Sequence, residues 1–288
     1  MFGPNPKFDL VKHFSKNVSH RDAEFSKTYR LCKNTIQNKF GFTNHDIIFV
    51  VGPATLSMEI VISSLEKGVC FKGVEGKFRS RWNEIAKNHG KFDDSNRPAN
   101  TGIVRLETSN STFNFGNSDI IDCVSSFPFQ QEDNPKVAIF CMNKLLGSIA
   151  GLSVIVVRKD CWNMFSKRDS YSYLDIFLHK QYSEIDQTPC TSPVYSFQLA
   201  LKCLLNHDIE KQRRRIISNS RLISSAAGSA LIGCSSSPVL TLKKAAFDTQ
   251  RLADFELYGM NSSSDVFQIF TYSESDESYQ KLYERLSC

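Results

Sequence analysis

The stretch Val137–Val157 reads VAIFCMNKLLGSIAGLSVIVV, which is two short apolar runs separated by a polar corner and a loop with two glycines. Apolar runs of five or six residues bounded by turn residues are typical of buried strands. The corner carries Lys144, and Asn143 stands directly before it. A half-buried lysine at the end of a strand can act as a nucleophilic amine. Taken alone, the pattern more often describes a lysine whose charged end stays in water.

Length and composition limit the classes of protein to consider. The chain has 288 residues, of which 41% are hydrophobic, so one large domain with a smaller lobe is expected. The net charge is +5, and the one basic run, Lys211–Arg215, fits a solvated helix face better than a nucleic-acid site. The nine cysteines show no zinc-site spacing, so we expect no metal. No secretory signal and no apolar run of membrane-spanning length is visible, which favours a cytoplasmic protein away from membranes.

Short apolar segments alternate with helical patterns over the first two thirds of the chain. This alternation predicts an α/β fold with a mainly parallel sheet, in which active groups collect at the carboxyl ends of the strands. The first helix is expected to run from about Ser19, as its N-cap, to Lys39, and the next from Leu56 to Leu65. We expect strands at Ile47–Val51, Val69–Val74, Ile103–Leu106, Asp119–Val124, Val137–Cys141 and Leu152–Val157.

The last third of the chain has a different pattern. A long helix is expected over Tyr195–Ile217 and a closing helix over Ser275–Leu286. Between them, the strand candidates are Val239–Leu242, Phe255–Tyr258 and Val266–Thr271. This part therefore predicts a smaller α+β lobe.

Two further features suggest a ligand site. Residues 52–55 (GPAT) join a strand to a helix, and such a turn can hold a phosphate against the helix N-terminus, although many similar turns bind nothing. Asp122 stands inside an apolar strand, where a carboxylate is costly unless a cation or hydrogen bonds meet it. From the sequence alone, a structural hydrogen bond and a bound cation are equally good explanations for a carboxylate at position 122 inside an apolar strand.

Taken in order, several segments resemble those of the class V, fold-type I pyridoxal-phosphate-dependent aminotransferases, and within them most closely the 2-aminoethylphosphonate:pyruvate aminotransferases. The resemblance extends from about Gly3 to Thr271. The segments that carry it are SHRDAEF (19–25), GPATLSME (52–59), EGKFRSR (75–81), ETSNSTFN (107–114), DCVSSF (122–127), NKLLGSIAGLSVIVV (143–157) and TSP (191–193).

The resemblance implies an architecture. It implies a large coenzyme-binding domain over residues 15–190, with a mainly parallel sheet of the seven-stranded type flanked by helices. Residues 1–14 and 191–288 would form the small, shortened lobe. It also implies a homodimer with a shared active site, small-molecule amine and keto acid substrates, and pyridoxal 5'-phosphate as the cofactor.

It implies roles for single residues as well. Lys144 would bind the coenzyme covalently and move the proton during catalysis, and Asp122 would pair with the pyridine nitrogen. Phe78 would stack on the ring, and Thr108 would lie near its phenolic oxygen. The remaining implied coenzyme contacts are Ala54 and Thr55 at the phosphate, Asn143 beside the lysine, and Thr191, which would come from the neighbouring subunit.

The chain departs from the family pattern at several positions. Pro53 replaces a small hydroxylic residue in the phosphate turn and removes one N–H donor. Arg79 stands in place of a glycine. Gln268 stands where the family has an arginine that grips the substrate carboxylate, so a charged clamp becomes a neutral amide. Arg251 and Arg21 are candidates to replace it.

Three functions follow for testing. The first is transfer of the amino group of 2-aminoethylphosphonate, or of a similar small amine, to pyruvate. The second is a lyase or decarboxylase reaction on a small amine with the same coenzyme, which the loss of the arginine favours. The third is a catalytically altered or inactive dimeric homologue, which Pro53, Gln268 and the short lobe support.

Overall fold

A computed structural model describes residues 19–130, 132, 134–169, 171–181, 191–205 and 208–287. The predicted segment 1–14 lies outside this range, as do residues 182–190 at the predicted domain boundary. The larger lobe contains α1 (Ala23–Lys39), β1 (His45–Val51), α2 (Ala54–Ser64), β2 (Val69–Lys72), α3 (Lys77–Asn88), β3 (Asn100–Val104), β4 (Leu106–Glu107), β5 (Thr112–Phe113), β6 (Ile120–Asp122), β7 (Val137–Cys141), β8 (Leu152–Arg158), α4 (Ile176–Gln181) and α5 (Ser192–Leu205). The smaller lobe contains α6 (Ile209–Ala227), β9 (Leu231–Ile232), β10 (Val239–Lys243), β11 (Val266–Phe270) and α7 (Asp276–Leu286).

The central sheet has six strands in the order β1-β8-β7-β6-β3-β2. The pairs β2–β3, β3–β6 and β6–β7 are parallel, and β8 runs antiparallel to both of its neighbours. The mainly parallel sheet is confirmed, but the described chain forms six strands rather than seven. At the outer edge of β2, a single parallel bridge joins Val69 to Phe92.

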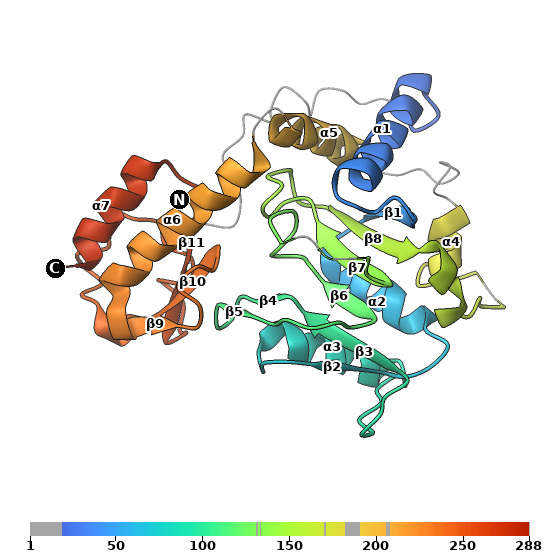
Figure 1. Cartoon of the computed structure of the whole chain (residues 1–288), viewed down its shortest axis with the longest axis horizontal. Coiled ribbons are helices and arrows are strands. Elements are labelled where there is room, and N and C mark those ends of the chain that lie inside the picture. Colours follow the sequence, from blue (N-terminus) through green and yellow to red (C-terminus); the bar gives the residue numbers. More distant parts are fainter. Residues whose placement is uncertain are drawn as a thin grey trace.

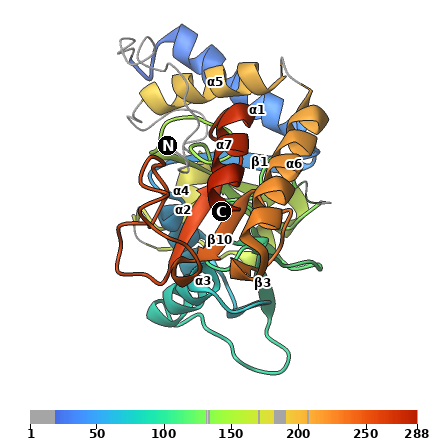
Figure 2. The ribbon, with the colours of Figure 1, turned by 90° about the vertical axis from the view of Figure 1, so that its left-hand side faces the viewer.

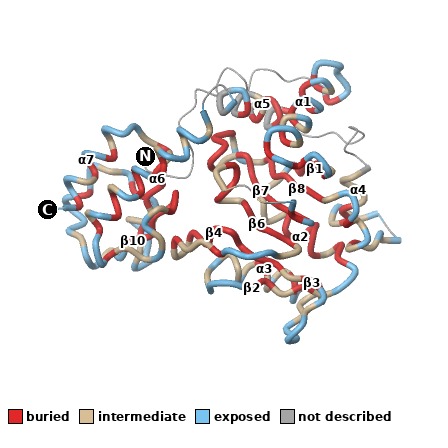
Figure 3. The backbone as a smooth tube through the Cα atoms, viewed as in Figure 1, coloured by how far each residue is buried: buried red, intermediate tan, exposed pale blue. Residues whose placement is uncertain are grey.

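Alternating residues of the central strands face two apolar clusters, which is why both faces of the sheet are covered by helices (Figure 1). Phe49 and Phe140 pack with α1 and α5 on one face. Ile48 and Ile139 pack with α2 and α3 on the other. The central strands β7 and β8 are consequently buried along almost their whole length (Figure 3). Their near-continuous apolar sequence is what a sheet buried on both sides requires.

Two predicted helix details differ from the structure. Asp22, not Ser19, caps α1, because its side chain accepts the hydrogen bond from the N–H of Glu24. The long helix predicted over Tyr195–Ile217 is two helices, α5 and α6. Asp208 begins the second one by accepting from the N–H of Lys211. Helix α5 packs against α1 and shares the apolar cluster of the larger lobe.

The small lobe is α+β, as the sequence predicts. Its three-stranded antiparallel sheet has the order β11-β10-β9, and α6 and α7 lie side by side next to it (Figure 2). The strand predicted at Phe255–Tyr258 is wrong, because only the bridge residues Leu257 and Tyr258 are found there, and Tyr258 pairs with Gln268 in an isolated bridge. None of the helices in the described ranges is long and apolar enough to cross a membrane. The same residues contain no cluster of three potential metal ligands.

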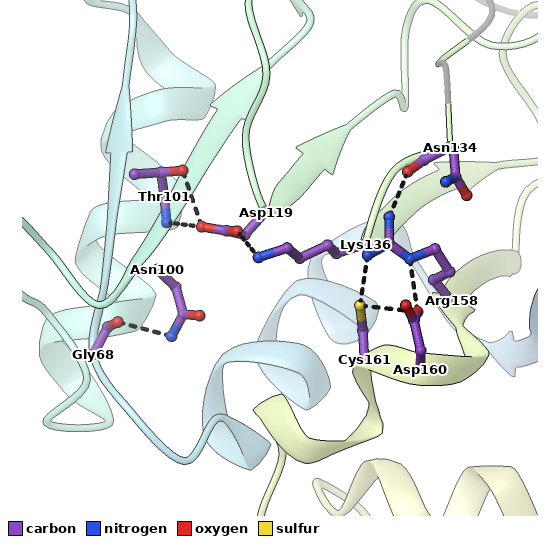
Figure 4. Close-up of polar contacts among 9 residues, drawn as sticks. All are labelled: Gly68, Asn100, Thr101, Asp119, Asn134, Lys136, Arg158, Asp160 and Cys161. Carbon is purple, nitrogen blue, oxygen red and sulfur yellow. Dashed lines mark hydrogen bonds and ion pairs between the residues drawn. The ribbon is translucent and has the colours of Figure 1, made fainter.

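A polar network ties the strands together at the amino edge of the sheet (Figure 4). Asp119 directly precedes β6 and accepts a hydrogen bond from the N–H of Thr101 at 2.7 Å. It also pairs at 2.6 Å with Nζ of Lys136, the residue directly before β7. Burial alone would raise the pKa of Asp119, but the hydrogen bonds from Lys136 and Thr101 outweigh it and hold the pKa below its usual value. Polar side chains at this edge therefore fix the relative positions of β3, β6 and β7.

We expect Asp119→Asn to lower the free energy of unfolding by about 1–3 kcal/mol at pH 7, since partly buried hydrogen bonds to a carboxylate are weakened or lost. A carboxylate whose pKa is lower in the folded chain stabilises the folded state at pH values above the pKa of the unfolded chain. This stabilisation is lost as the pH falls through the pKa of the folded chain. The difference in the free energy of unfolding between Asp119→Asn and the unmodified chain should therefore become smaller below about pH 4. Urea unfolding at several pH values measures it. Asp254→Asn, which removes an exposed acid 3.7 Å from Arg285, is the control and should have little effect. A penalty that does not change with pH would contradict this interpretation.

Candidate functional site

The candidate site lies at the carboxyl edge of the sheet, opposite that network. Strand β6 ends at Asp122, and β7 ends at Cys141, with Lys144 three residues further on. Because β6 and β7 are parallel neighbours, with Asp122 opposite Ile139, both side chains belong to the same edge. The turn after β1 joins this edge, since the N–H of Gly52 donates to the carbonyl of Gly151 at 2.9 Å. The predicted turn and lysine loop are thus adjacent.

A cavity of about 640 Å³ opens between the two lobes at this edge. Three predicted site residues, Lys144, Phe78 and Thr108, line it from the larger lobe, and the small lobe contributes Gln268 and Phe270 among others. Lys144 is half-buried, and its Nζ lies 5.8 Å from the centre of the Phe270 ring. The sequence therefore predicted the environment of this lysine correctly, and its position gives the cavity an amine in its wall.

Asp122 is not among the described residues that line this cavity. Its side chain is 3% exposed, and Oδ2 accepts from Trp82 Nε1 at 2.7 Å while Oδ1 accepts from the N–H of Val124 at 2.9 Å. Burial raises the pKa of Asp122 to about 6, and the hydrogen bonds from Trp82 and Val124 oppose that rise only in part. The acid thus has hydrogen-bond partners, yet its ionised form is still disfavoured.

Trp82 is a residue that the sequence analysis missed. It lies on α3, one turn after Phe78, is fully buried, and stacks on Phe71 with 4.2 Å between the ring centres. A spacing of four residues on a helix places Trp82 and Phe78 on the same face, which is the one signal in the sequence that could have linked it to the site. The indole N–H fixes the orientation of the Asp122 carboxyl group.

We expect the fluorescence of Trp82 to report the charge of Asp122, since the indole N–H donates directly to the carboxylate. In a Trp162→Phe background without coenzyme, the emission should titrate with a midpoint near pH 6, with the acid protonated below it. The added change Asp122→Asn should abolish that transition. A transition that persists in the Asp122→Asn chain would show that another group titrates.

Glu107 is a second buried acid near the cavity, and its role is structural. It is fully buried, and its carboxylate accepts from the N–H groups of Phe78 and Arg79, each at 3.0 Å, and from Ser109 Oγ at 2.5 Å. A negative charge at this position offsets the positive end of the helix dipole. A Cβ on Gly76 would lie 2.2 Å from the Glu107 side chain, so only glycine fits there. This cap positions Phe78 at the start of α3.

Gln268 lies in the cavity, where the resemblance places an arginine. Its Nε2 donates to the carbonyl of Thr108 at 2.5 Å and to Thr241 Oγ1 at 3.3 Å. Thr241 Oγ1 also donates to the same Thr108 carbonyl, at 2.9 Å. The amide donors of Gln268 therefore join the small lobe to the larger one at Thr108. Neither Arg251 nor Arg21 is among the described residues that line the cavity.

The remaining predicted residues also do not line the cavity. Ala54 and Thr55 begin α2, where Pro53 is the N-cap and provides no side-chain hydrogen bond. The first turn of a helix leaves backbone N–H groups without intrahelical partners, so this end can still receive an anion. Asn143 is half-buried next to Lys144. Thr191 is buried at the start of α5 in its own chain.

Comparisons with known proteins agree with this geometry at the level of the fold. A solved phosphoserine aminotransferase from Cytophaga hutchinsonii superposes with a TM-score of 0.83 at 18% identity, over 99% of this chain and 97% of that one. A ureidoglycine–glyoxylate aminotransferase from Bacillus subtilis gives 0.82 at 17% identity, over 100% of this chain and 91% of that one. The chain has the fold of these solved aminotransferases, which is the fold-type I architecture. The fold class predicted from the sequence is confirmed.

Sequence comparison gives a likeness over part of the chain. Curated phosphoserine aminotransferases from Campylobacter jejuni are 26% identical over 216 residues, which is 66% of this chain. The chain spans 60% of the length of those relatives. No protein-family model matches. The relatives carry the name phosphoserine aminotransferase, so the particular likeness to 2-aminoethylphosphonate:pyruvate aminotransferases is not confirmed by these comparisons.

Proposed function

We propose that this protein is a pyridoxal-phosphate-dependent aminotransferase. The observation that carries the proposal is a half-buried amine, Lys144, facing an interlobe cavity with a buried acid, Asp122, at the end of the adjacent strand. A fold-type I architecture and relatives named as aminotransferases support it.

The residues present fit the coenzyme. The cavity volume falls within the range of roughly 300–1,000 Å³ found for small-molecule sites. The ionised form of Asp122 is disfavoured by burial, and a protonated pyridine nitrogen would supply the cation that it lacks. The N-terminus of α2 is suited to a phosphate even though Pro53 removes one donor. When bound, pyridoxal phosphate supplies an aldehyde carbon and a ring that accepts electron density from the substrate.

Each side chain then has a definite task. Lys144 would hold the coenzyme, and as a free amine it would take a proton from the carbon that bears the substrate nitrogen. Asp122, oriented by Trp82, would pair with the ring nitrogen and favour its protonated form. Phe78 would pack on the ring face and Thr108 would border it, while Ala54 and Thr55 would hold the phosphate. Asn143 stands beside the lysine as a further coenzyme contact.

The proposal includes a homodimer and a choice of substrates. Thr191 directly precedes α5 and does not line the cavity of its own chain, and it is the residue that we propose to reach the phosphate of a second copy. For the donor we propose 2-aminoethylphosphonate or a similar small amine, with pyruvate as acceptor. Phosphoserine is the second candidate donor, because the curated relatives are phosphoserine aminotransferases.

The test is the absorbance spectrum of the purified chain after addition of pyridoxal phosphate, followed by each amine. We expect a visible band that either donor converts to the pyridoxamine form, and transfer of nitrogen to pyruvate. Lys144→Ala should abolish the band and slow transfer by about 10²–10⁴-fold, because the proton-transfer group is removed.

Lys159→Ala is the matched control, since this exposed lysine follows β8 at the opposite edge of the sheet. It should leave both the band and transfer unchanged. An unmodified chain that forms no band would support the non-catalytic alternative. Loss of the amine without transfer of its nitrogen would support lyase or decarboxylase chemistry.

A further inference from the structure

The charge of the interlobe cavity suggests how a substrate is recognised, and this inference rests on the proposed function. The described residues that line the cavity include two lysines, Lys77 and Lys144, and no aspartate or glutamate. The buried carboxylate of Glu107 lies nearby, but backbone N–H groups of α3 occupy it. A cavity with cations and no acids in its wall favours an anionic ligand.

The other groups in the cavity leave that anion without a charged partner. Lys144 is required for the coenzyme under the proposed function. Gln268 uses its amide donors on Thr108 and Thr241, so only an oxygen acceptor is left to face a ligand. An acceptor cannot bind the oxygens of an anion. The position that would carry the arginine clamp therefore does not supply the positive charge.

Lys77 is placed to supply the positive charge that an anion in the cavity requires. It is the first residue of α3, and its backbone N–H donates to Ser109 Oγ at 3.0 Å, which fixes its position at the cavity. Two other cations of the same segment have different contacts. Arg79 donates to the carbonyls of Phe71 and Gly73, at 3.1 and 2.8 Å, and Arg81 lies over the Phe78 ring at 5.1 Å.

The ammonium of Lys77 is also not paired with an acid. Among the ion pairs found within the described ranges, none includes this residue, and its side chain is exposed. Asn261 and Ser264 of the small lobe line the same cavity and carry neutral donors. The anion would therefore be held between the start of α3 and the loop before β11.

We propose that Lys77 binds the anionic group of the amino donor, and that this group is a phosphonate or phosphate rather than a carboxylate. Arginine recognises a planar carboxylate through two parallel hydrogen bonds, whereas the lysine ammonium is a compact point charge without that geometry. A tetrahedral phosphorus oxyanion offers three oxygens and up to two negative charges to such a group. The replacement of the arginine clamp by Gln268 thus goes together with a change in the anion that is recognised.

The first arm of the test measures binding of methylphosphonate to the full chain without coenzyme, by titration calorimetry. Lys77→Gln should weaken binding by about 10–100-fold, as expected for loss of one charge-assisted hydrogen bond. Lys77→Arg should retain most of the affinity. Lys72→Gln is the control, since it removes an exposed lysine five positions away that does not line the cavity, and it should change affinity less than about twofold. Acetate should bind more weakly than methylphosphonate to the unmodified chain.

The second arm measures the affinity for pyridoxal phosphate by absorbance, which separates the phosphate of the coenzyme from that of the substrate. Lys77→Gln should leave this affinity unchanged. Equal methylphosphonate binding by the Lys77→Gln and Lys72→Gln chains, or none by the unmodified chain, would overturn the inference. Loss of coenzyme affinity in Lys77→Gln would also overturn it. Failure of the proposed function would look different, because the coenzyme would not bind while methylphosphonate binding still depended on Lys77.

Discussion

The parallel pairing of β6 with β7 is the constraint on which the candidate site depends. It brings the end of one strand, Asp122, and the residues just after the other, including Lys144, to one edge of the sheet. The opposite edge is fastened by Asp119 and Lys136, which precede the same two strands. Polar side chains thus fix the strand positions at one edge and leave the other edge for chemistry. The helices on both faces exclude water from the strands between them.

Buried acids near the cavity serve two different purposes. Glu107 is satisfied by backbone N–H groups and shapes the start of α3, from which both Phe78 and Lys77 reach the cavity. Asp122 is held by Trp82 and Val124, but burial still disfavours its charge. A carboxyl group whose ionised form is disfavoured by its surroundings is typical of functional sites. The first acid therefore positions the site, and the second is the one expected to meet a ligand.

Local sequence patterns predicted much of this arrangement. Strand Val137–Cys141 has the bounds expected from its apolar run, and the half-buried lysine follows it as expected. The break between α5 and α6 was missed because the apolar pattern continues across it, and only the cap at Asp208 marks the new start. The contact of Trp82 with Asp122 spans 40 positions, and that of Gln268 with Thr108 spans 160. No local pattern specifies contacts of that kind, so only the structure shows that Gln268 joins the lobes.

The central claim, that Lys144 is the amine that binds the coenzyme, is tested most directly by chemical reduction. The full chain is mixed with pyridoxal phosphate, treated with borohydride to fix any bond between a lysine and the aldehyde, digested, and mapped by mass spectrometry. The account predicts one saturable modification, on the peptide that contains Lys144, with little on exposed lysines such as Lys159. Modification spread evenly over exposed lysines, with Lys144 unmodified, would contradict it.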